Sequence, residues 1–128
     1  MSRRIIKTTT PLNAVTATTT SVAISMEGVR KASLLLTRAD HSSGSSAFKV
    51  QVSIDGGTTY VDFNSLIQDL TNTNAQDVVR ATTITLSSNT SVLASVDLQR
   101  VAITHMKVVV TETTDGTHTA VLSREYEA

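Results

Sequence analysis

The sequence predicts an all-β protein, a single-domain antiparallel β-sandwich of about eight strands with jelly-roll-like topology. Thr, Val and Ile together make up 44 of the 128 residues, and such β-branched residues favour strands over helices. Residues 48–54 alternate strictly between apolar and polar side chains, which is the period of a half-buried strand. Short polar turns separate the apolar segments at regular intervals, as they do in sandwiches and barrels.

The segment from Phe48 to Phe63 is the expected centre of the core, and it holds three of the four aromatic residues. Alternation predicts two sets of residues on its first strand. The inward set is Phe48, Val50, Val52 and Ile54, and the more exposed set is Lys49, Gln51 and Ser53. Asp55, Gly56 and Gly57 form the expected structural turn, since glycine accepts the positive φ of a tight hairpin. Thr58–Phe63 then returns as a second strand.

The remaining strands are expected at residues 18–26, 29–38, 80–86, 92–96, 101–111 and 118–126. In the first of them Val22, Ile24 and Met26 share one face. In the second, Leu35 lies on the face opposite Leu34 and Leu36, which indicates a central strand or an outer face that something else covers. The apolar phase of residues 101–111 changes near Thr104 and His105, which predicts a bulge. Asp115 and Gly116 form a second structural turn.

Three segments are expected to lie outside this framework. The loops at 40–46 and 64–80 are polar, although Leu66, Ile67 and Leu70 have helical spacing and leave a short helix as an alternative. Residues 1–17 are basic, then Thr-rich. We expect them to be an extended N-terminal arm, separate from a sandwich domain at 18–128 and mobile when alone, so that its removal leaves the sandwich folded.

The arm supplies the candidate protein-interface residues, which are Arg3, Arg4, Lys7 and Pro11. Its cations suit an acidic patch on a neighbouring subunit, and such binding weakens with salt. The alternative interpretation is a frayed terminus.

Charge and composition exclude several classes of partner. Formal net charge is zero, so no overall field attracts the protein to nucleic acid or to an anionic membrane. The chain has no cysteine, which excludes disulfides and thiolate metal sites. We find no signal peptide and no apolar segment of membrane-spanning length, and expect synthesis in the cytoplasm.

No residue set predicts an active site, a cofactor or a metal. His41, His105 and His118 lack ligand spacing and are interpreted as solvated or structural. A Ser-His-Asp triad is not excluded by counting, but no Gly-x-Ser-x-Gly motif supports one. Asp55 and Asp62 flank the hairpin as glycosidase carboxylates would, yet a turn role for Asp55 is the stronger interpretation. We therefore expect no catalytic residues and no enzyme activity.

The order of motifs resembles a known group of proteins. Gly28-Val29-Arg30-Lys31 precedes a Leu-rich strand, Phe48 to Val61 forms the hairpin, and Met106 to Thr111 precedes Asp115-Gly116. This order resembles small β-sandwich virion proteins, similar to head decoration proteins, from the structural gene clusters of tailed bacteriophages. The chain departs from their pattern, with Tyr60 in place of the usual Trp and Lys107 near the place of the usual Arg.

The resemblance implies a capsid decoration or cement protein at the virion surface. Its expected partners are the major capsid protein and further copies of itself, as a dimer or trimer. The alternatives are a head-completion or tail component, or a module on the same fold that binds carbohydrate on the host surface.

Overall fold

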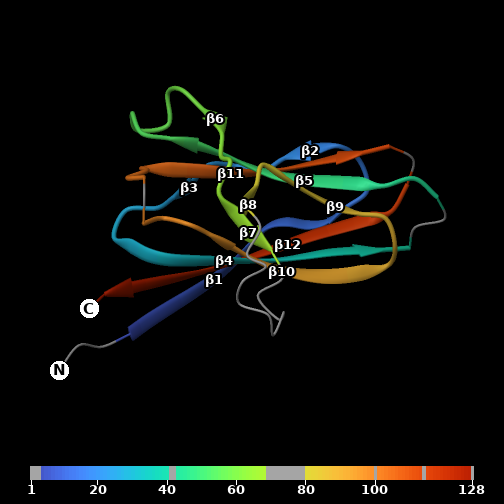
Figure 1. Ribbon diagram of the computed structural model, residues 1–128, viewed down its shortest axis with the longest axis horizontal. Coiled ribbons are helices and arrows are strands. Elements are labelled where there is room, and N and C mark those ends of the chain that lie inside the picture. The colour runs from blue at the N-terminus through green and yellow to red at the C-terminus, as the bar shows by residue number, and fades with distance from the viewer. Residues whose placement is uncertain (1–3, 41–42, 69–79, 100, 114, 128) are drawn as a thin grey trace.

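The computed structural model describes residues 4–40, 43–68, 80–99, 101–113 and 115–127, and it consists of two antiparallel sheets packed face to face (Figure 1). Sheet A has the order β1 (Arg4–Val15), β12 (Thr117–Glu127), β4 (Val29–Ala39), β10 (Thr90–Val96), β7 (Leu66–Gln68) and β8 (Arg80–Ala81). Sheet B has the order β2 (Thr19–Thr20), β11 (His105–Glu112), β5 (Ser46–Ser53) and β6 (Val61–Asp62). In addition, β3 (Ile24–Ser25) pairs with β11, and β9 (Thr83–Leu86) pairs with β5. The predicted β-sandwich is confirmed, and the described part of the chain contains no helix that could cross a membrane.

The strand order is that of a jelly roll. With β2 and β3 counted as one, the eight principal strands are β1, β2/β3, β4, β5, β9, β10, β11 and β12. The first, eighth, third and sixth of these lie side by side in sheet A, and the second, seventh, fourth and fifth lie in sheet B. Two interleaved Greek keys give this arrangement. The expected number of about eight is therefore met, although by a different set of segments.

The largest difference from expectation is the N-terminal segment, which belongs to sheet A. Residues 4–15 are extended, as expected, but they form β1 and pair with β12 from Arg4 opposite Glu127 to Val15 opposite His118. Leu12 is only 1% exposed and lies within the core. The described residues of the expected arm are thus the first strand of the jelly roll. Their Thr-rich composition suits a strand as well as it suits an arm.

The core lies between the two sheets and follows the alternation of their strands. Leu34 and Leu36 on β4 point inward, and Leu35 points outward, as the sequence predicts. Buried side chains from the facing strands complete the layer. They include Phe48, Val50 and Val52 on β5, Met106, Val108 and Val110 on β11, and Ala120 and Leu122 on β12.

The expected register of β5 fails at its last two positions. Ile54 is 75% exposed, whereas Ser53 is buried. Ser53 is held at the end of the strand, because its carbonyl accepts a 2.8 Å hydrogen bond from the Thr104 amide and its hydroxyl accepts one of 2.9 Å from the Gly57 amide. The chain turns after Ser53, so Ile54 points into solvent. The return strand is also shorter than expected, since only Val61–Asp62 forms β6.

Three further expectations need correction. Residues 18–26 form the two short strands β2 and β3, between which Val22 is 79% exposed. β11 begins at His105, so the change of apolar phase marks the start of a strand and not a bulge within one. Residues 66–68 form strand β7 where a helix was the alternative, and residues 69–79 lie outside the described part.

Truncating Val50 should destabilise the fold far more than truncating Ile54. Val50→Ala removes a side chain that is 1% exposed, and we expect it to lower the free energy of unfolding by about 1–3 kcal/mol through lost burial and a cavity. The matched change Ile54→Ala alters an exposed position and should stay within about 0.5 kcal/mol. Denaturant unfolding of both variants checks this, and equal losses would contradict the observed register.

Strand β1 should contribute to stability. Leu12→Ala is expected to lower the free energy of unfolding by about 2–5 kcal/mol, because a fully buried side chain is truncated. The neighbouring exposed residue Asn13 provides the control, and Asn13→Ala should change it by less than about 0.5 kcal/mol. Deleting residues 2–10 should also lower the melting temperature, since it removes the pairs from Arg4–Glu127 to Thr9–Leu122. An unchanged melting temperature would indicate that this segment is an arm that does not stabilise the sandwich.

Candidate functional site

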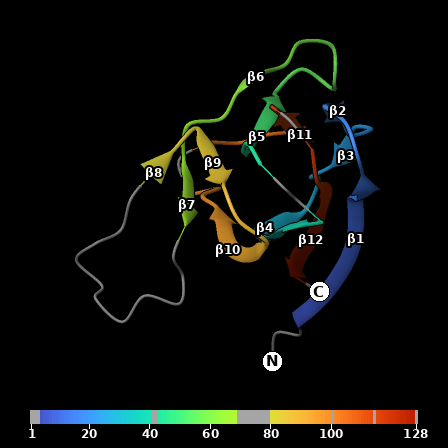
Figure 2. The ribbon, with the colours of Figure 1, turned by 90° about the vertical axis from the view of Figure 1, so that its right-hand side faces the viewer.

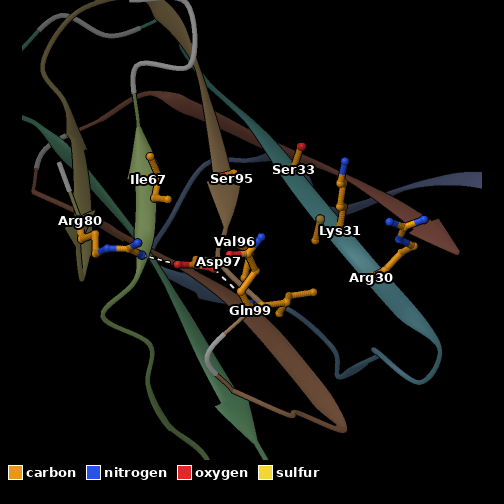
Figure 3. Close-up of a pocket in the computed structure, with 11 residues that line it drawn as sticks. Arg30, Lys31, Ser33, Ile67, Arg80, Ser95, Val96, Asp97 and Gln99 are labelled. Atoms are coloured by element: carbon orange, nitrogen blue, oxygen red, sulfur yellow. Dashed lines mark hydrogen bonds and ion pairs between the residues drawn. The ribbon is translucent and has the colours of Figure 1, made fainter. Parts of the chain in front are cut away.

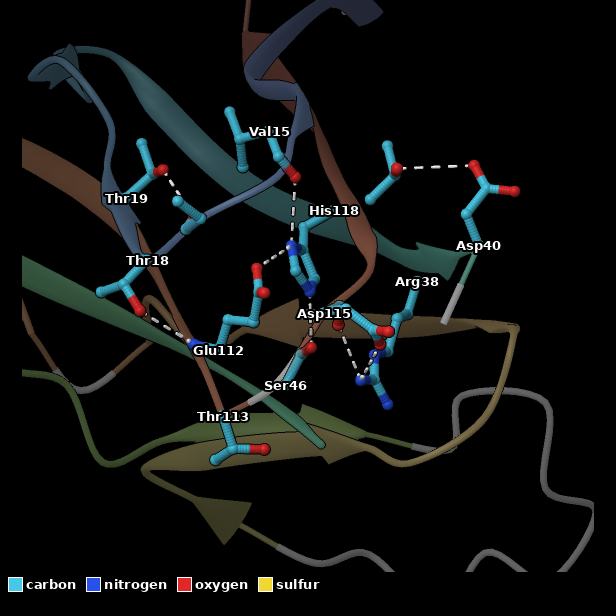
Figure 4. Close-up of polar contacts among 12 residues, drawn as sticks. Val15, Thr18, Thr19, Arg38, Asp40, Ser46, Glu112, Thr113, Asp115 and His118 are labelled. Atoms are coloured by element: carbon cyan, nitrogen blue, oxygen red, sulfur yellow. Dashed lines mark hydrogen bonds and ion pairs between the residues drawn. The ribbon is translucent and has the colours of Figure 1, made fainter. Parts of the chain in front are cut away.

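A buried polar cluster occupies one end of the sandwich, between the two sheets (Figure 4). His118 of β12 and Ser46 of β5 are both 0% exposed. His118 Nδ1 lies 3.1 Å from the Val15 carbonyl, and His118 Nε2 lies 2.5 Å from Ser46 Oγ. Since a carbonyl only accepts, Nδ1 carries a proton, and in the neutral ring Nε2 then accepts from the serine hydroxyl. The cluster therefore links β1, β12 and sheet B through one imidazole ring.

Ser46, His118 and Glu112 lie in the order of a Ser-His-acid triad, but Ser46 and His118 are not accessible to a substrate. Glu112 Oε2 lies 3.7 Å from His118 Nδ1, on the side of the ring away from Ser46. A catalytic serine must reach a substrate carbonyl, with its base beside it. Ser46 and His118 have no exposed surface, so the pair makes a structural contact between the layers.

Arg38 is the second centre of this cluster and is 1% exposed. Its guanidinium donates to the carbonyl oxygens of Ser43 at 2.9 Å, Gly44 at 3.0 Å, Asp115 at 2.9 Å and Leu86 at 3.3 Å. Ser43, Gly44 and Asp115 lie in two separate connections between strands, and Leu86 is the last residue of β9. Charge-assisted hydrogen bonds of this kind offset the cost of burying a cation. Arg38 thus fastens the loops at this end of the sandwich.

The predicted turn at Asp115 and Gly116 borders this cluster. Gly116 has a φ of +126°, a conformation that side chains disfavour. A Cβ atom there would lie 3.1 Å from Arg38 Nε and 3.3 Å from His118 Nε2. Glycine is therefore needed both for the backbone angle and for the space that the buried polar groups occupy.

The predicted turn after β5 is built around Asp55. Gly56 and Gly57 have φ values of +78° and +93°. Asp55 Oδ1 accepts hydrogen bonds from the amides of Thr59 at 2.9 Å and Thr58 at 3.2 Å, and from the Ser53 hydroxyl at 2.7 Å. These donors, the Thr59 amide first, lower the pKa of Asp55 to about 2.

The remaining acidic and histidine candidates are also local. Asp62 lies 3.2 Å from Lys49 Nζ, and the hydrogen bond from Lys49 lowers the pKa of Asp62. His105 is half-buried at the start of β11, and His41 lies outside the described residues. Within the described ranges, no group of three His, Cys, Asp or Glu side chains is placed to hold a metal ion.

The most distinctive surface is the outer face of sheet A, where three rows of side chains run across β10, β4 and β12. The central row is apolar, with Leu35 42% exposed beside Leu93, which is 37% exposed, and Val121. Hydroxyl-bearing rows lie on both sides. One contains Ser91, Thr37 and Thr119, and the other contains Ser95, Ser33 and Ser123. We call these nine residues the uncharged face, because none of them carries a charge.

Charged residues border the uncharged face at one end (Figure 3). Lys31 and Glu125 form the next cross-strand pair, and Arg80 of β8 makes an ion pair with Asp97. Between these groups and the hydroxyl row lies an open groove of about 540 Å³. The face therefore has an apolar centre, hydroxyl-bearing flanks and charged groups at one end.

The predicted interface residues have partners within the chain where the structure describes them. Arg4 Nε lies 3.5 Å from Glu125, and Lys7 Nζ lies 5.3 Å from the centre of the Tyr126 ring. Pro11 lies within the first irregularity of register in β1, between Thr9 and Leu12, and Arg3 lies outside the described residues. Their role in binding another protein stays a prediction.

Sequence reasoning missed the buried cluster and most of the uncharged face. The signal was present in the strand period. Arg38 continues the inward phase of Leu34 and Leu36, and Ser46 continues that of Phe48 and Val50. Polar residues in an inward phase indicate a buried network. The outward position of Leu35 follows from alternation, but its neighbours Leu93 and Val121 depend on a strand order that a single sequence does not contain.

The turn at Asp55 should make stability fall with acid. The folded pKa of about 2 lies below the usual aspartate pKa of 3.8. The carboxylate therefore stabilises the fold fully above the unfolded pKa and progressively less as pH falls toward 2. A carboxyl titration followed by NMR should give a midpoint near 2 for Asp55. Asp55→Asn should make thermal stability less dependent on pH between these two values. A midpoint near 4 would contradict the hydrogen bonding described.

Comparison with known proteins identifies the fold but not a family. No protein-family model matches the chain, and no curated protein sequence matches it. Among solved structures, it is similar to the SPBc2 prophage-derived protein YomS, with a TM-score of 0.67 and 15% sequence identity. The similarity covers 96% of this chain and 95% of the other. At this identity the match establishes a shared architecture along almost the full length of both chains.

Proposed function

We propose that this protein is a non-enzymatic structural protein of a bacteriophage virion, a decoration or cement protein that binds the major capsid protein at the capsid surface. The observation that carries the proposal is the uncharged face. Leu35 and Leu93 are exposed at the centre of this face. The core of the protein lies on the opposite side of sheet A, so these leucines are not needed to cover it.

The fold supports a phage origin. The similar structure is that of a prophage-derived protein, and it matches nearly from end to end. The motif order of the sequence resembles phage virion proteins independently of that match. Fold alone does not define function, so the specific role rests on the surface.

The uncharged face has the properties of a docking surface for a large protein. Charged residues are depleted at the centres of protein interfaces, because they lose hydration there. The row of Leu35, Leu93 and Val121 offers aliphatic contact, and the Ser and Thr rows offer donors and acceptors that tolerate a modest desolvation cost. Thr37 and Ser91 already share a 2.9 Å hydrogen bond, so the flank is partly ordered before binding.

The size of this face suits a protein that acts in many copies. Three rows about 7 Å apart on three strands about 4.8 Å apart cover roughly 300 Å². A stable interface buries about 800 Å² on each partner. One face alone therefore gives weak attachment, and surrounding loops or neighbouring copies must add to it. A cement protein meets this condition, because the capsid presents its binding sites in a repeating array.

Replacing Leu35 by lysine should prevent attachment without unfolding the protein. The site is already 42% exposed, so we expect a melting temperature close to that of the wild type. A charge at the centre of the docking surface should weaken capsid binding at least about tenfold, equivalent to about 1.4 kcal/mol. Co-sedimentation with purified expanded capsids measures this. Val22→Lys, at a position 79% exposed on the sheet B side, is the matched control.

Two results would count against the proposed role. Equal capsid binding by the Leu35 and Val22 variants would remove the uncharged face from the interface. Binding of the wild type to isolated tails or to host-surface carbohydrate, with none to capsids, would favour one of the alternative roles.

A further inference from the structure

We propose that the free edge of β1 pairs with the same edge of a second copy of this chain, which joins two A sheets into one continuous sheet. β1 ends sheet A on the side opposite β8, as Figure 2 shows. Its pairing partner is β12, and on its other side no described strand is hydrogen-bonded to it. Such an edge presents alternating N–H and C=O groups that can template another strand.

The two halves of β1 differ in how readily they can pair with an added strand. The second half has register irregularities between Thr9 and Leu12 and between Leu12 and Val15, a proline at position 11, and Ala14 at a φ of +52°. Bulges and proline are features that block edge pairing. The first half, Arg4 to Thr9, pairs with β12 in an unbroken register. Pairing with another strand is therefore directed to residues 4–9.

Apolar side chains are exposed in this open half. Ile5 is 40% exposed and Ile6 is 51% exposed, and the core of their own subunit leaves them uncovered to that extent. A strand added beside β1 would cover both. Strand edges in soluble proteins are usually protected by charges or short length. Arg4 and Lys7 flank the two isoleucines here, but each of these cations already contacts a residue of its own chain, Glu125 and Tyr126 respectively.

The charges of β1 and the length of its regular half favour one antiparallel register between two copies. A two-fold axis perpendicular to the sheet keeps equivalent faces together, so each residue opposes one of the same alternation phase. With the axis at Ile6, Arg4 opposes Thr8, Ile5 opposes Lys7, and Ile6 opposes its own copy. No two like charges meet. An axis at Lys7 would oppose two lysines, which is destabilising. An axis at Ile5 would leave only residues 4–6 paired within the described strand, and an axis at Thr8 would leave only residues 7–9 paired within its regular half.

One consequence rests on the proposed function. Because the axis is perpendicular to the sheet, the uncharged faces of both copies point the same way, on either side of the two paired β1 strands. This doubles the roughly 300 Å² of docking face estimated from strand spacing. Two linked copies would then attach to a repeating capsid surface by avidity. The pairing itself requires no capsid and is tested in solution.

A pair of single-cysteine variants tests both the edge and the register, since the chain has no native cysteine. In the proposed register, the two Cα atoms at position 6 are about 4.5–5.5 Å apart, within the range of a disulfide. At position 8 they are separated by four residues, or about 13 Å. Mild oxidation should therefore cross-link Ile6→Cys into a covalent dimer and leave Thr8→Cys monomeric. Equal cross-linking of the two variants, or none in either, would overturn the register.

Sedimentation equilibrium tests the association without new thiols. The wild-type chain should approach twice its 13.6 kDa mass as concentration rises. Ile6→Lys places two like charges opposite each other and should raise the dimer dissociation constant at least tenfold, whereas Val22→Lys should leave it unchanged. A wild type that stays monomeric throughout would overturn the proposal. Because no capsid is present, this result is independent of whether the protein binds one.

Discussion

The pairing of β1 with β12 determines which strand forms the edge of sheet A and which side chains cover that side of the core. It joins the two ends of the chain, with Arg4 opposite Glu127, and places β12 inside sheet A between β1 and β4. Leu12 then reaches the core beside Ala120. Without β1, the edge of sheet A would move to β12, and the side chains that Leu12 covers would meet solvent. The same pairing gives the uncharged face an interior position in the sheet, because β12 supplies one side of each of its rows.

The buried polar cluster imposes a second constraint, at one end of the sandwich. An isolated cation in an apolar interior costs several kcal/mol, and Arg38 avoids this cost by donating to four backbone carbonyls. Three of those carbonyls, those of Ser43, Gly44 and Asp115, belong to connections between strands, and the fourth is at the end of β9. The imidazole of His118 links Val15 to Ser46 in a comparable way. Polar side chains in inward strand positions thus order the loops, while aliphatic residues hold the layers together.

The sequence was informative where a strand runs uninterrupted through the core. Alternation correctly placed Leu34, Leu36, Val50 and Val52 inward. It failed at Ile54, because the strand had already ended at Ser53. The fate of residues 4–15 was not predictable from alternation, since threonine and lysine suit a solvated arm and an edge strand alike. Their pairing depends on β12, which lies more than a hundred residues away along the chain. The uncharged face has the same limitation, because its central row combines three strands that are distant in sequence.

The contacts of β1 also change the kind of association expected from this segment. Sequence reasoning emphasised its cations, and therefore a contact that salt would weaken. In the structure, Arg4 approaches Glu125 and Lys7 approaches the ring of Tyr126, so part of their electrostatic interaction is made within the chain. What β1 still offers to another molecule is a backbone ladder and two exposed isoleucines. Hydrogen bonds between strands act at short range, and so do apolar contacts. Dissolved ions screen exposed charges beyond about 10 Å at 0.1 M salt, but they leave these short-range interactions largely unaffected. Association through this edge should therefore persist at high salt, in contrast to association through a basic arm.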